Sequence, residues 1–190
     1  MQRYNIGFAM TGSFCTFKKI IPVIKLLSDD GNEMYPILSK AVAETDTRFG
    51  RAEDLKTELE KITGCKPMTE ITEVEPIGPK KILDVLVVAP CTGNSLSKIA
   101  NGIADTAVTL AVKSHLRNNK PVVIAVSTND GLGANAQNIG KLMARKHIYL
   151  VPFCQDDCTE KENSLVADFT KIPKTIESAM YGNQIQPLLI

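Results

Sequence analysis

The sequence predicts a single α/β domain with a three-layer, Rossmann-like fold, in which helices cover both faces of a doubly wound parallel sheet. Short apolar runs rich in Val and Ile recur along the chain, and amphipathic segments of helix length separate them. The apolar runs lack polar alternation, which is typical of strands buried on both faces. The 190 residues, 44% of them hydrophobic, are enough for one domain with a sizeable core.

The expected elements follow the hydrophobic pattern in chain order. Strands are predicted at 4–10, 34–39, 84–90, 121–127 and 147–153. Helices are predicted at 17–30, 51–64, 95–119 and 138–146. Gly31 and Gly64 follow the first two helices, where glycine commonly ends a helix.

The remaining segments are expected to connect or extend this core. Residues 69–79 contain two prolines and a glycine and are expected to form an ordered loop. Residues 155–164 are expected to be a polar loop, serving as a linker, a lid or an interface. Residues 165–190 are expected to form a C-terminal helix, around 166–180, and a tail, so that residues 1–190 make up one domain.

Charge and hydropathy exclude several classes of partner. The 22 basic and 21 acidic residues give a net charge of +1, which does not favour nucleic acid or an anionic membrane. No apolar run approaches the roughly 20 residues of a membrane helix, and the first residues do not resemble a secretion signal. We therefore expect a cytoplasmic protein.

The reactive side chains do not form a familiar catalytic or metal-binding pattern. The five cysteines are scattered without a CxxC pair, and neither His115 nor His147 falls in a predicted ligand loop. We therefore expect no metal site, and no Ser-His-Asp or Cys-His arrangement is present. Any chemistry is expected to depend on a cofactor.

The loops after the first two predicted strands suggest an anion site. In doubly wound sheets, ligands bind outside the carboxyl ends of the strands. Gly12 and Ser13 follow the first strand and precede a helix, and Ser39 and Thr45 follow the second strand. A single phosphate fits this pattern better than a dinucleotide, because the GxGxxG spacing is absent. Helix capping by Ser13 and an ordinary turn at Ser39 are alternative explanations.

The loop after strand 84–90 is richer in polar groups than a turn requires. Pro90 and Cys91 are followed by Thr92, Gly93, Asn94 and Ser95, and a helix pattern then begins. One cap and one glycine would complete an ordinary strand-to-helix turn. The additional donors and acceptors favour contact with a planar, hydrogen-bonding ligand.

A second polar loop follows strand 121–127 at the same expected edge of the sheet. The segment STNDGLGANAQNIGKL carries several asparagines and glycines, and Asp130 is its only carboxylate. It is expected to be either a substrate flap or a plain loop.

Residues 5–152 resemble the flavoprotein family of homo-oligomeric flavin-containing cysteine decarboxylases and flavin prenyltransferases. The segments that carry the resemblance are TGS at 11–13, the hydroxyl of Ser39, APCTGNSLSKIANGIAD at 89–105 and NIGKLMARKHIYLVP at 138–152.

The resemblance implies FMN as the cofactor and a homo-oligomeric assembly. Gly12 and Ser13 would hold the FMN phosphate, with a further contact from Ser39. The residues that would line the flavin or the substrate beside it are Thr92, Gly93, Asn94 and Ser95, with Asn94 as the candidate catalytic residue.

Two departures from the family pattern bear on the reaction. Pro76 stands where the decarboxylases carry a histidine, and Ser127 stands where the prenyltransferases carry an arginine. Both of those activities are therefore disfavoured.

Further segments, including EPIGPK at 75–80 and STNDGLG at 127–133, resemble one branch of the family. That branch implies one component of a two-component oxidoreductase in the mother-cell cytoplasm of a spore-forming bacterium. Its substrate would be a dihydropyridine dicarboxylate that is oxidised to the aromatic ring, and NAD(P) would enter through the partner protein.

Two alternative functions stay open from the sequence, and so does the choice of charged residues that would bind the dicarboxylate. The chain could be a flavin-dependent decarboxylase of another substrate, or a non-catalytic scaffold for its partner. Lys98, Lys113 and Arg117 are candidate charge partners for the dicarboxylate, although exposed helix positions are the favoured explanation for each of them.

Overall fold

Seven strands form one sheet in the order β2-β1-β3-β4-β7-β6, and β5 also pairs with β4. The computed structural model describes residues 3–190. The strands are β1 (Asn5–Met10), β2 (Glu33–Leu38), β3 (Val85–Cys91), β4 (Val122–Thr128), β5 (Ile148–Leu150), β6 (Phe153–Asp157) and β7 (Lys161–Ala167). The first five are parallel, whereas β7 runs antiparallel to both β4 and β6.

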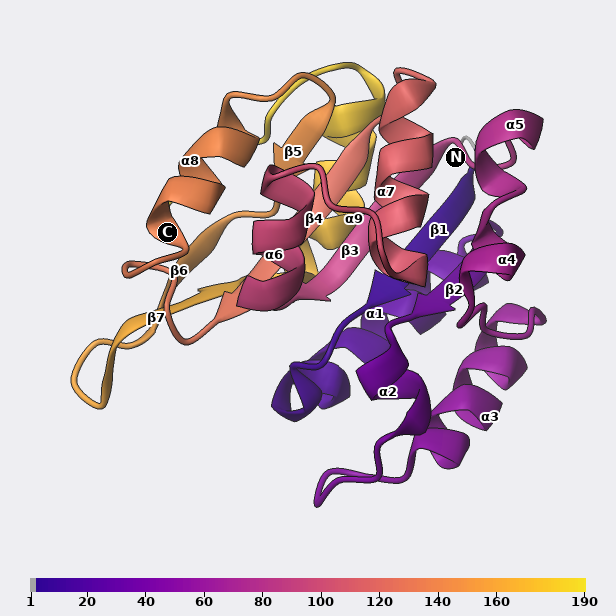
Figure 1. The fold of residues 1–190 in the computed structure, drawn as a ribbon, viewed down its shortest axis with the longest axis horizontal. Coiled ribbons are helices and arrows are strands. Elements are labelled where there is room, and N and C mark those ends of the chain that lie inside the picture. Colours follow the sequence, from indigo (N-terminus) through magenta and orange to yellow (C-terminus); the bar gives the residue numbers. More distant parts are fainter. Residues whose placement is uncertain (1–2) are drawn as a thin grey trace.

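Helices cover both faces of this sheet, which confirms the predicted three-layer fold. They are α1 (Phe17–Asp29), α2 (Lys40–Glu44), α3 (Ala52–Thr63), α4 (Ile71–Val74), α5 (Ile77–Lys80), α6 (Gly93–Ala100), α7 (Ala107–Arg117), α8 (Ala136–Met143) and α9 (Ile172–Met180). Figure 1 shows α6 and α7 in front of the sheet and α1 and α9 behind it. Short 3-10 turns precede α1 and α9.

The core lies along the central strands. Every residue of β3 is buried, and all of β4 except Thr128 is buried. Val is the most frequent residue in both strands, because β-branched side chains pack well on a pleated surface that is covered on both faces. The core is therefore continuous across β1, β3 and β4, and it holds their carboxyl ends in fixed positions.

The single helix expected at 95–119 is wrong: two helices, α6 and α7, occupy this region. Gly102 has a left-handed backbone (φ 73°) that interrupts the helix. Thr106 then caps α7 by accepting the Thr109 N–H at 3.2 Å. An ion pair of 2.8 Å between Lys98 and Asp105 spans the break.

The polar stretch 155–164 is a β-hairpin rather than the expected loop. The Asp157 carboxylate accepts the N–H groups of Thr159 and Glu160, both at 3.0 Å, and so fixes the turn. The charged residues lie on the exposed part of the hairpin, which explains why the sequence resembled a linker. The expected strand 147–153 accordingly divides into β5 and β6, and the last helix begins at Ile172 rather than near 166.

Residues 69–79 also contain more structure than the predicted loop. Glu70 and Glu73 form a capping box that starts α4, and α5 follows after one further turn. Helix α2, which was not expected, occupies part of the segment after β2. The boundaries of α1 and α3, and of β1 to β4, agree with the predicted ranges to within one or two residues.

The outer edge of β5 is closed by a side chain instead of another strand. Gln184 accepts the Leu150 N–H at 2.8 Å and donates to the Leu150 carbonyl at 2.7 Å. The amide thus supplies both hydrogen bonds that a neighbouring strand would make to Leu150. An unpaired edge would leave these backbone groups without partners.

Replacing Gln184 with Ala should lower the free energy of unfolding by about 1–2 kcal/mol, because two partly buried backbone groups lose their partners. Gln186→Ala is a matched control, since that side chain is exposed and should change stability by less than about 0.5 kcal/mol. Urea denaturation of both variants measures the difference. Equal effects of the two substitutions would contradict the assigned role of Gln184.

Candidate functional site

A cavity of about 770 Å³ opens at the carboxyl ends of β1, β3 and β4. Five of the residues singled out in the sequence lie together on its wall: Gly12, Ser13, Thr92, Gly93 and Asn94. Hairpin β6–β7 forms another part of the wall, with Ser164, Leu165 and Val166. The volume lies within the range of small-molecule and cofactor sites.

Thr11 joins the two central loops of the cavity. Its hydroxyl donates to the Pro90 carbonyl at 2.8 Å and accepts the Thr92 N–H at 2.9 Å. The Thr11 side chain is buried, and its own N–H donates to the same Pro90 carbonyl at 3.2 Å. Sequence reasoning missed Thr11, because a threonine at a strand end gives no distinctive signal.

Ser13 reaches across to the end of β4. Its hydroxyl is 2.8 Å from the hydroxyl of Ser127, so the two form a hydrogen bond at the cavity wall. Ser13 makes no side-chain capping bond, which counts against the simple capping explanation. Ser127 therefore belongs to the site, although the sequence identified it only as a position that lacks arginine.

Helix α6 begins at the cavity wall with a closely packed glycine. A Cβ atom on Gly93 would lie 2.6 Å from both the Thr128 Oγ1 and the Asn135 Nδ2. Glycine is therefore required here by close approach between α6 and the loop after β4. Asn94 follows as an exposed residue on the wall, whereas Ser95 is buried and accepts a hydrogen bond from the Thr92 hydroxyl at 3.3 Å.

Ser39 follows the end of β2 and is not among the residues that line the cavity. Its N–H donates to the Met10 carbonyl at 3.0 Å, and Gly12 packs near Ala41, two residues further on. The Ser39 Oγ is buried and has no hydrogen-bond partner within residues 3–190. Because buried hydroxyls are normally paired, the Ser39 hydroxyl suits a ligand oxygen that accepts a hydrogen bond from it.

A row of amide side chains supports the loop after β4. Asn135 donates to the Asp130 carboxylate at 2.8 Å and accepts from Asn138 at 3.0 Å. Both asparagines are buried, so these hydrogen bonds are shielded from water. The segment expected to be a flap or a plain loop is thus a tight turn supported by these hydrogen bonds, and its last part forms α8.

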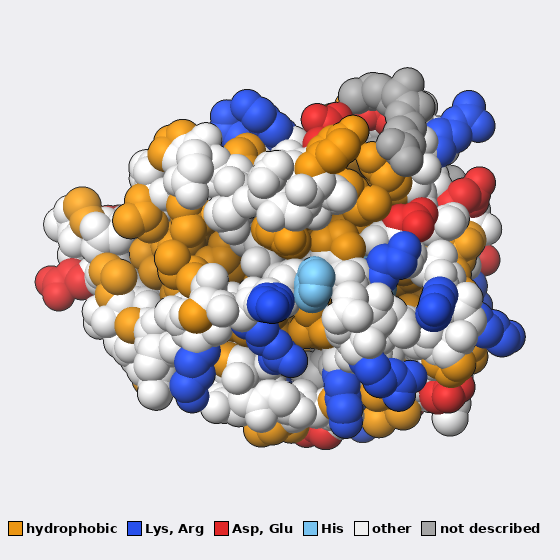
Figure 2. Space-filling view, turned by 90° about the horizontal axis from the view of Figure 1, so that it is seen from above, with side chains coloured by type: hydrophobic (Ala, Val, Ile, Leu, Met, Phe, Trp, Pro, Cys, Tyr) orange, Lys and Arg blue, Asp and Glu red, His pale blue; other side chains and the backbone are white. Residues whose placement is uncertain are grey.

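The charged side chains at the cavity differ from those expected. Lys19, Arg48 and Lys161 line it, and Lys161 is 2.8 Å from Asp156. Lys98, Lys113 and Arg117 do not line it. Lys98 is paired with Asp105, while α7 runs away from the cavity and ends, at Arg117, near the start of β4. Figure 2 views this opposite end of the molecule, where several Lys and Arg side chains gather.

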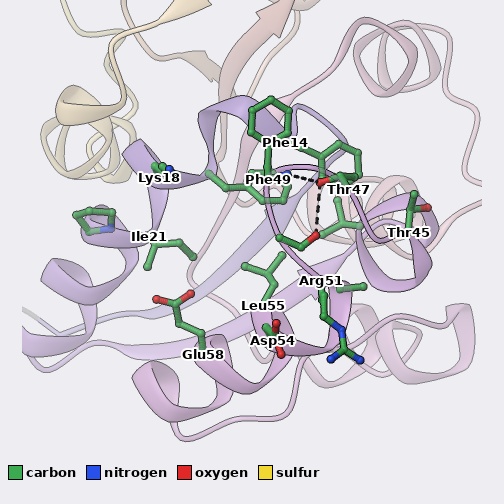
Figure 3. A pocket seen from close by; sticks show the side chains of 15 residues that line it. Phe14, Lys18, Ile21, Thr45, Thr47, Phe49, Arg51, Asp54, Leu55 and Glu58 are labelled. Carbon is green, nitrogen blue, oxygen red and sulfur yellow. Dashed lines mark hydrogen bonds between the residues drawn. The ribbon is translucent and has the colours of Figure 1, made fainter.

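A second, more apolar cavity of about 480 Å³ lies between α1, α3 and the loop 45–51. Figure 3 shows Phe14, Ile21 and Leu55 around it, with Lys18 and Glu58 at its margin. Thr47 orders the loop by accepting the Phe49 N–H at 3.1 Å. Phe14 and Phe49 line both cavities, so aromatic rings separate the two spaces.

The histidines and the buried cysteine do not supply chemistry to the cavity. His115 is buried in α7, and this burial lowers its pKa to about 4. Burial raises the pKa of the Cys91 thiol to about 12, so it stays protonated at neutral pH. Within the described residues, no group of three or more potential ligands could hold a metal ion. None of the helices described is both long and apolar enough to cross a bilayer.

Comparison with known proteins places this architecture in a family. The sequence model of the family described as "Flavoprotein" matches residues 1–180. The chain belongs to the flavoprotein family. It is 45% identical over 186 residues to the B subunit of dipicolinate synthase from Bacillus subtilis, covering 98% of this chain and 93% of that protein.

Solved structures agree with this assignment. The crystal structure of the dipicolinate synthase B subunit from Bacillus halodurans superposes with a TM-score of 0.91 at 44% identity, covering 98% of this chain and 96% of the other. The FMN-dependent cysteine decarboxylase SpaF shares the fold, with a TM-score of 0.67 at 24% identity and coverage of 93% and 95%. Membership of the family gives the chain a flavin-linked role.

Gly93→Ala should reduce the free energy of unfolding by about 1–3 kcal/mol, because the added methyl group would collide with Thr128 and Asn135. Gly140→Ala is the matched control: it adds the same methyl group to a helix, where nothing lies within 4 Å of the new atom. The control should keep or raise the melting temperature, since alanine favours helix. If both variants unfold at the same temperature, the close approach at Gly93 is not important for stability.

Proposed function

We propose that this flavoprotein is the FMN-binding component of a dipicolinate synthase. It would act with an A subunit to oxidise a dihydrodipicolinate-type precursor to pyridine-2,6-dicarboxylate. The similarity to two dipicolinate synthase B subunits over almost the whole chain supports the reaction and the partner. NAD(P) would enter through the A subunit, and the compartment would be the mother cell of a sporulating bacterium.

The observation that carries the cofactor proposal is an unpaired hydroxyl at the end of β2. The Ser39 Oγ is buried without a partner within residues 3–190, and the Ser39 N–H bonds to Met10, two residues before Gly12 on the cavity wall. A phosphate group accepts hydrogen bonds from such hydroxyls and from backbone N–H groups. The donor set therefore fits the FMN phosphate, which Gly12, Ser13 and Ser39 would hold.

The neighbouring wall suits the rest of the ligand. FMN, when bound, supplies an acceptor for a hydride. Thr92, Gly93 and Asn94 would border the flavin or the substrate, and Ser95 would support this wall from behind by its contact with Thr92. Asn94 is exposed at the cavity and would donate a hydrogen bond to a substrate carboxylate. The free hydroxyls and amides would orient the substrate without adding charge.

The two alternative functions are less well supported. A decarboxylase that uses histidine as an acid is disfavoured, because neither histidine lines the cavity and Pro76 lies at the start of α5, outside its wall. A pure scaffold would not need an unpaired buried hydroxyl together with a cavity of this size. We also propose a homo-oligomer, whose mass light scattering would measure.

Ser39→Ala should weaken FMN binding about tenfold, because a hydroxyl contact with the phosphate is lost. Riboflavin lacks the phosphate and is the matched probe: its affinity should stay within about twofold. Fluorescence titration of FMN and of riboflavin against the wild-type protein and Ser39→Ala measures the change in affinity for each ligand. An equal loss for FMN and riboflavin would place the phosphate elsewhere.

Turnover tests the function directly. The chain combined with a dipicolinate synthase A subunit should form pyridine-2,6-dicarboxylate only when FMN is present, as followed by the absorbance of the product. Asn94→Ala should reduce turnover by about 10²-fold or more, with assembly and FMN binding retained, because substrate orientation is lost. Undiminished turnover without FMN would refute the cofactor proposal, and undiminished turnover in Asn94→Ala would favour the scaffold.

A further inference from the structure

Asp130 is a cavity carboxylate without a cationic partner. It follows β4 in the turn beneath hairpin β6–β7 and lines the cavity together with Thr128 and Asn129. The other carboxylate on the wall, Asp156, is neutralised by Lys161 at 2.8 Å. Among residues 3–190, no Lys or Arg forms an ion pair with Asp130.

The surrounding turn holds this carboxylate in one orientation. Asn135 donates its amide to the Asp130 Oδ1 at 2.8 Å, and Asn138 in turn donates to Asn135 at 3.0 Å. The Asp130 carbonyl accepts the N–H groups of Gly133 and Asn135 at 3.1 and 3.2 Å. The backbone and the side chain of Asp130 are thus both held in place. A group that acts on a substrate needs such fixed positioning.

The second oxygen remains available for chemistry. No described donor bonds to the Asp130 Oδ2, whereas Oδ1 is occupied by an amide that carries no charge. An amide donor orients a carboxylate without neutralising its charge. The cavity offers no histidine for this task, and no glutamate lines it.

We propose that Asp130 is the general base of the oxidation, an inference that rests on the proposed function. Aromatising the dihydropyridine ring removes one hydride and one proton. A ring C–H bond breaks and its electron pair leaves with the hydrogen as hydride, for which oxidised FMN, when bound, would be the acceptor. A second hydrogen, on an adjacent ring atom, passes as a proton to the Asp130 Oδ2. The electrons of that second bond form the new ring double bond, and the base later releases its proton to solvent.

This assignment gives the two sides of the site different roles. Ser13, Ser39 and the start of α6 offer hydrogen-bond donors, which suit anionic oxygens. Asp130 offers only acceptors, so it would repel a substrate carboxylate and face ring hydrogen instead. The substrate would therefore lie with its carboxylates toward the donors and its ring toward Asp130.

Asp130→Asn keeps the size of the side chain and removes the base. With the A subunit and FMN, kcat should fall by about 10²- to 10⁴-fold, while the Kd for FMN stays within about twofold. Asp130→Glu restores a carboxylate and should recover at least about tenfold of the lost rate. Asp29→Asn is the control for an equal change of charge, because this residue lies exposed at the end of α1 and pairs with Lys25.

A binding measurement separates this role from a general loss of structure. Pyridine-2,6-dicarboxylate is a dianion, so removing the negative charge of Asp130 should tighten its binding to the FMN-loaded protein by about threefold to tenfold. The change in flavin absorbance on titration measures the affinity. Unchanged or weaker binding of this dianion to Asp130→Asn would contradict the assignment.

The outcomes distinguish the two proposals. If the wild-type protein neither binds FMN nor turns over with the A subunit, the proposed function fails. If the wild type turns over and Asp130→Asn retains more than about a third of the rate, Asp130 is not the base and the proposed function stands. Loss of FMN binding in both Asp130→Asn and Asp130→Glu would show a structural role and overturn the assignment of Asp130 as the base.

Discussion

The buried hydroxyl of Thr11 is the contact on which the rest of the site depends. It joins the end of β1 to the loop after β3 through the Pro90 carbonyl and the Thr92 N–H. This junction sets where Thr92 stands, and Thr92 is the residue from which α6 starts. An apolar residue at position 11 would leave the partly buried Thr92 N–H without its partner, which is costly. The contact therefore fixes two walls of the cavity at once.

A second constraint couples α6 to the loop after β4. Gly93 leaves room for Thr128 and Asn135, and Asn135 uses that room to hold Asp130. The same contact thus sets the position of the start of α6 and the orientation of the Asp130 carboxylate. The start of α6 and the loop after β4 can approach closely because residue 93 has no Cβ atom.

The sequence allowed much of the fold and part of the site to be predicted, for identifiable reasons. Strands β1 to β4 were recognisable because burial on both faces selects apolar runs without polar alternation. Hairpin β6–β7 was not, because charged and polar residues occupy its turn and the adjoining parts of both strands. Gly12, Ser13 and Thr92 to Asn94 could be placed at one edge because parallel strands bring their carboxyl ends together.

Other parts of the site depend on contacts between distant segments. The hydrogen bonds from Thr11 to Pro90 and from Ser13 to Ser127 span 79 and 114 residues, and no local pattern encodes either. Ser39 was identifiable as a hydroxyl after a strand, but its lack of a partner is visible only once its neighbours are in place. Sequence patterns therefore locate the loops, whereas tertiary packing determines which of their side chains are free.

The charge of the cavity explains why composition gave no sign of an anion site. Lys19 and Arg48 are the cations on its wall that form no ion pair within residues 3–190, because Lys161 is neutralised by Asp156. Two such side chains do not balance a phosphate together with a dicarboxylate. The remaining stabilisation would come from hydroxyls and from backbone N–H groups at the start of α6, which are fixed dipoles and do not appear in a count of charged residues. A net charge of +1 is therefore compatible with a site for two anionic ligands.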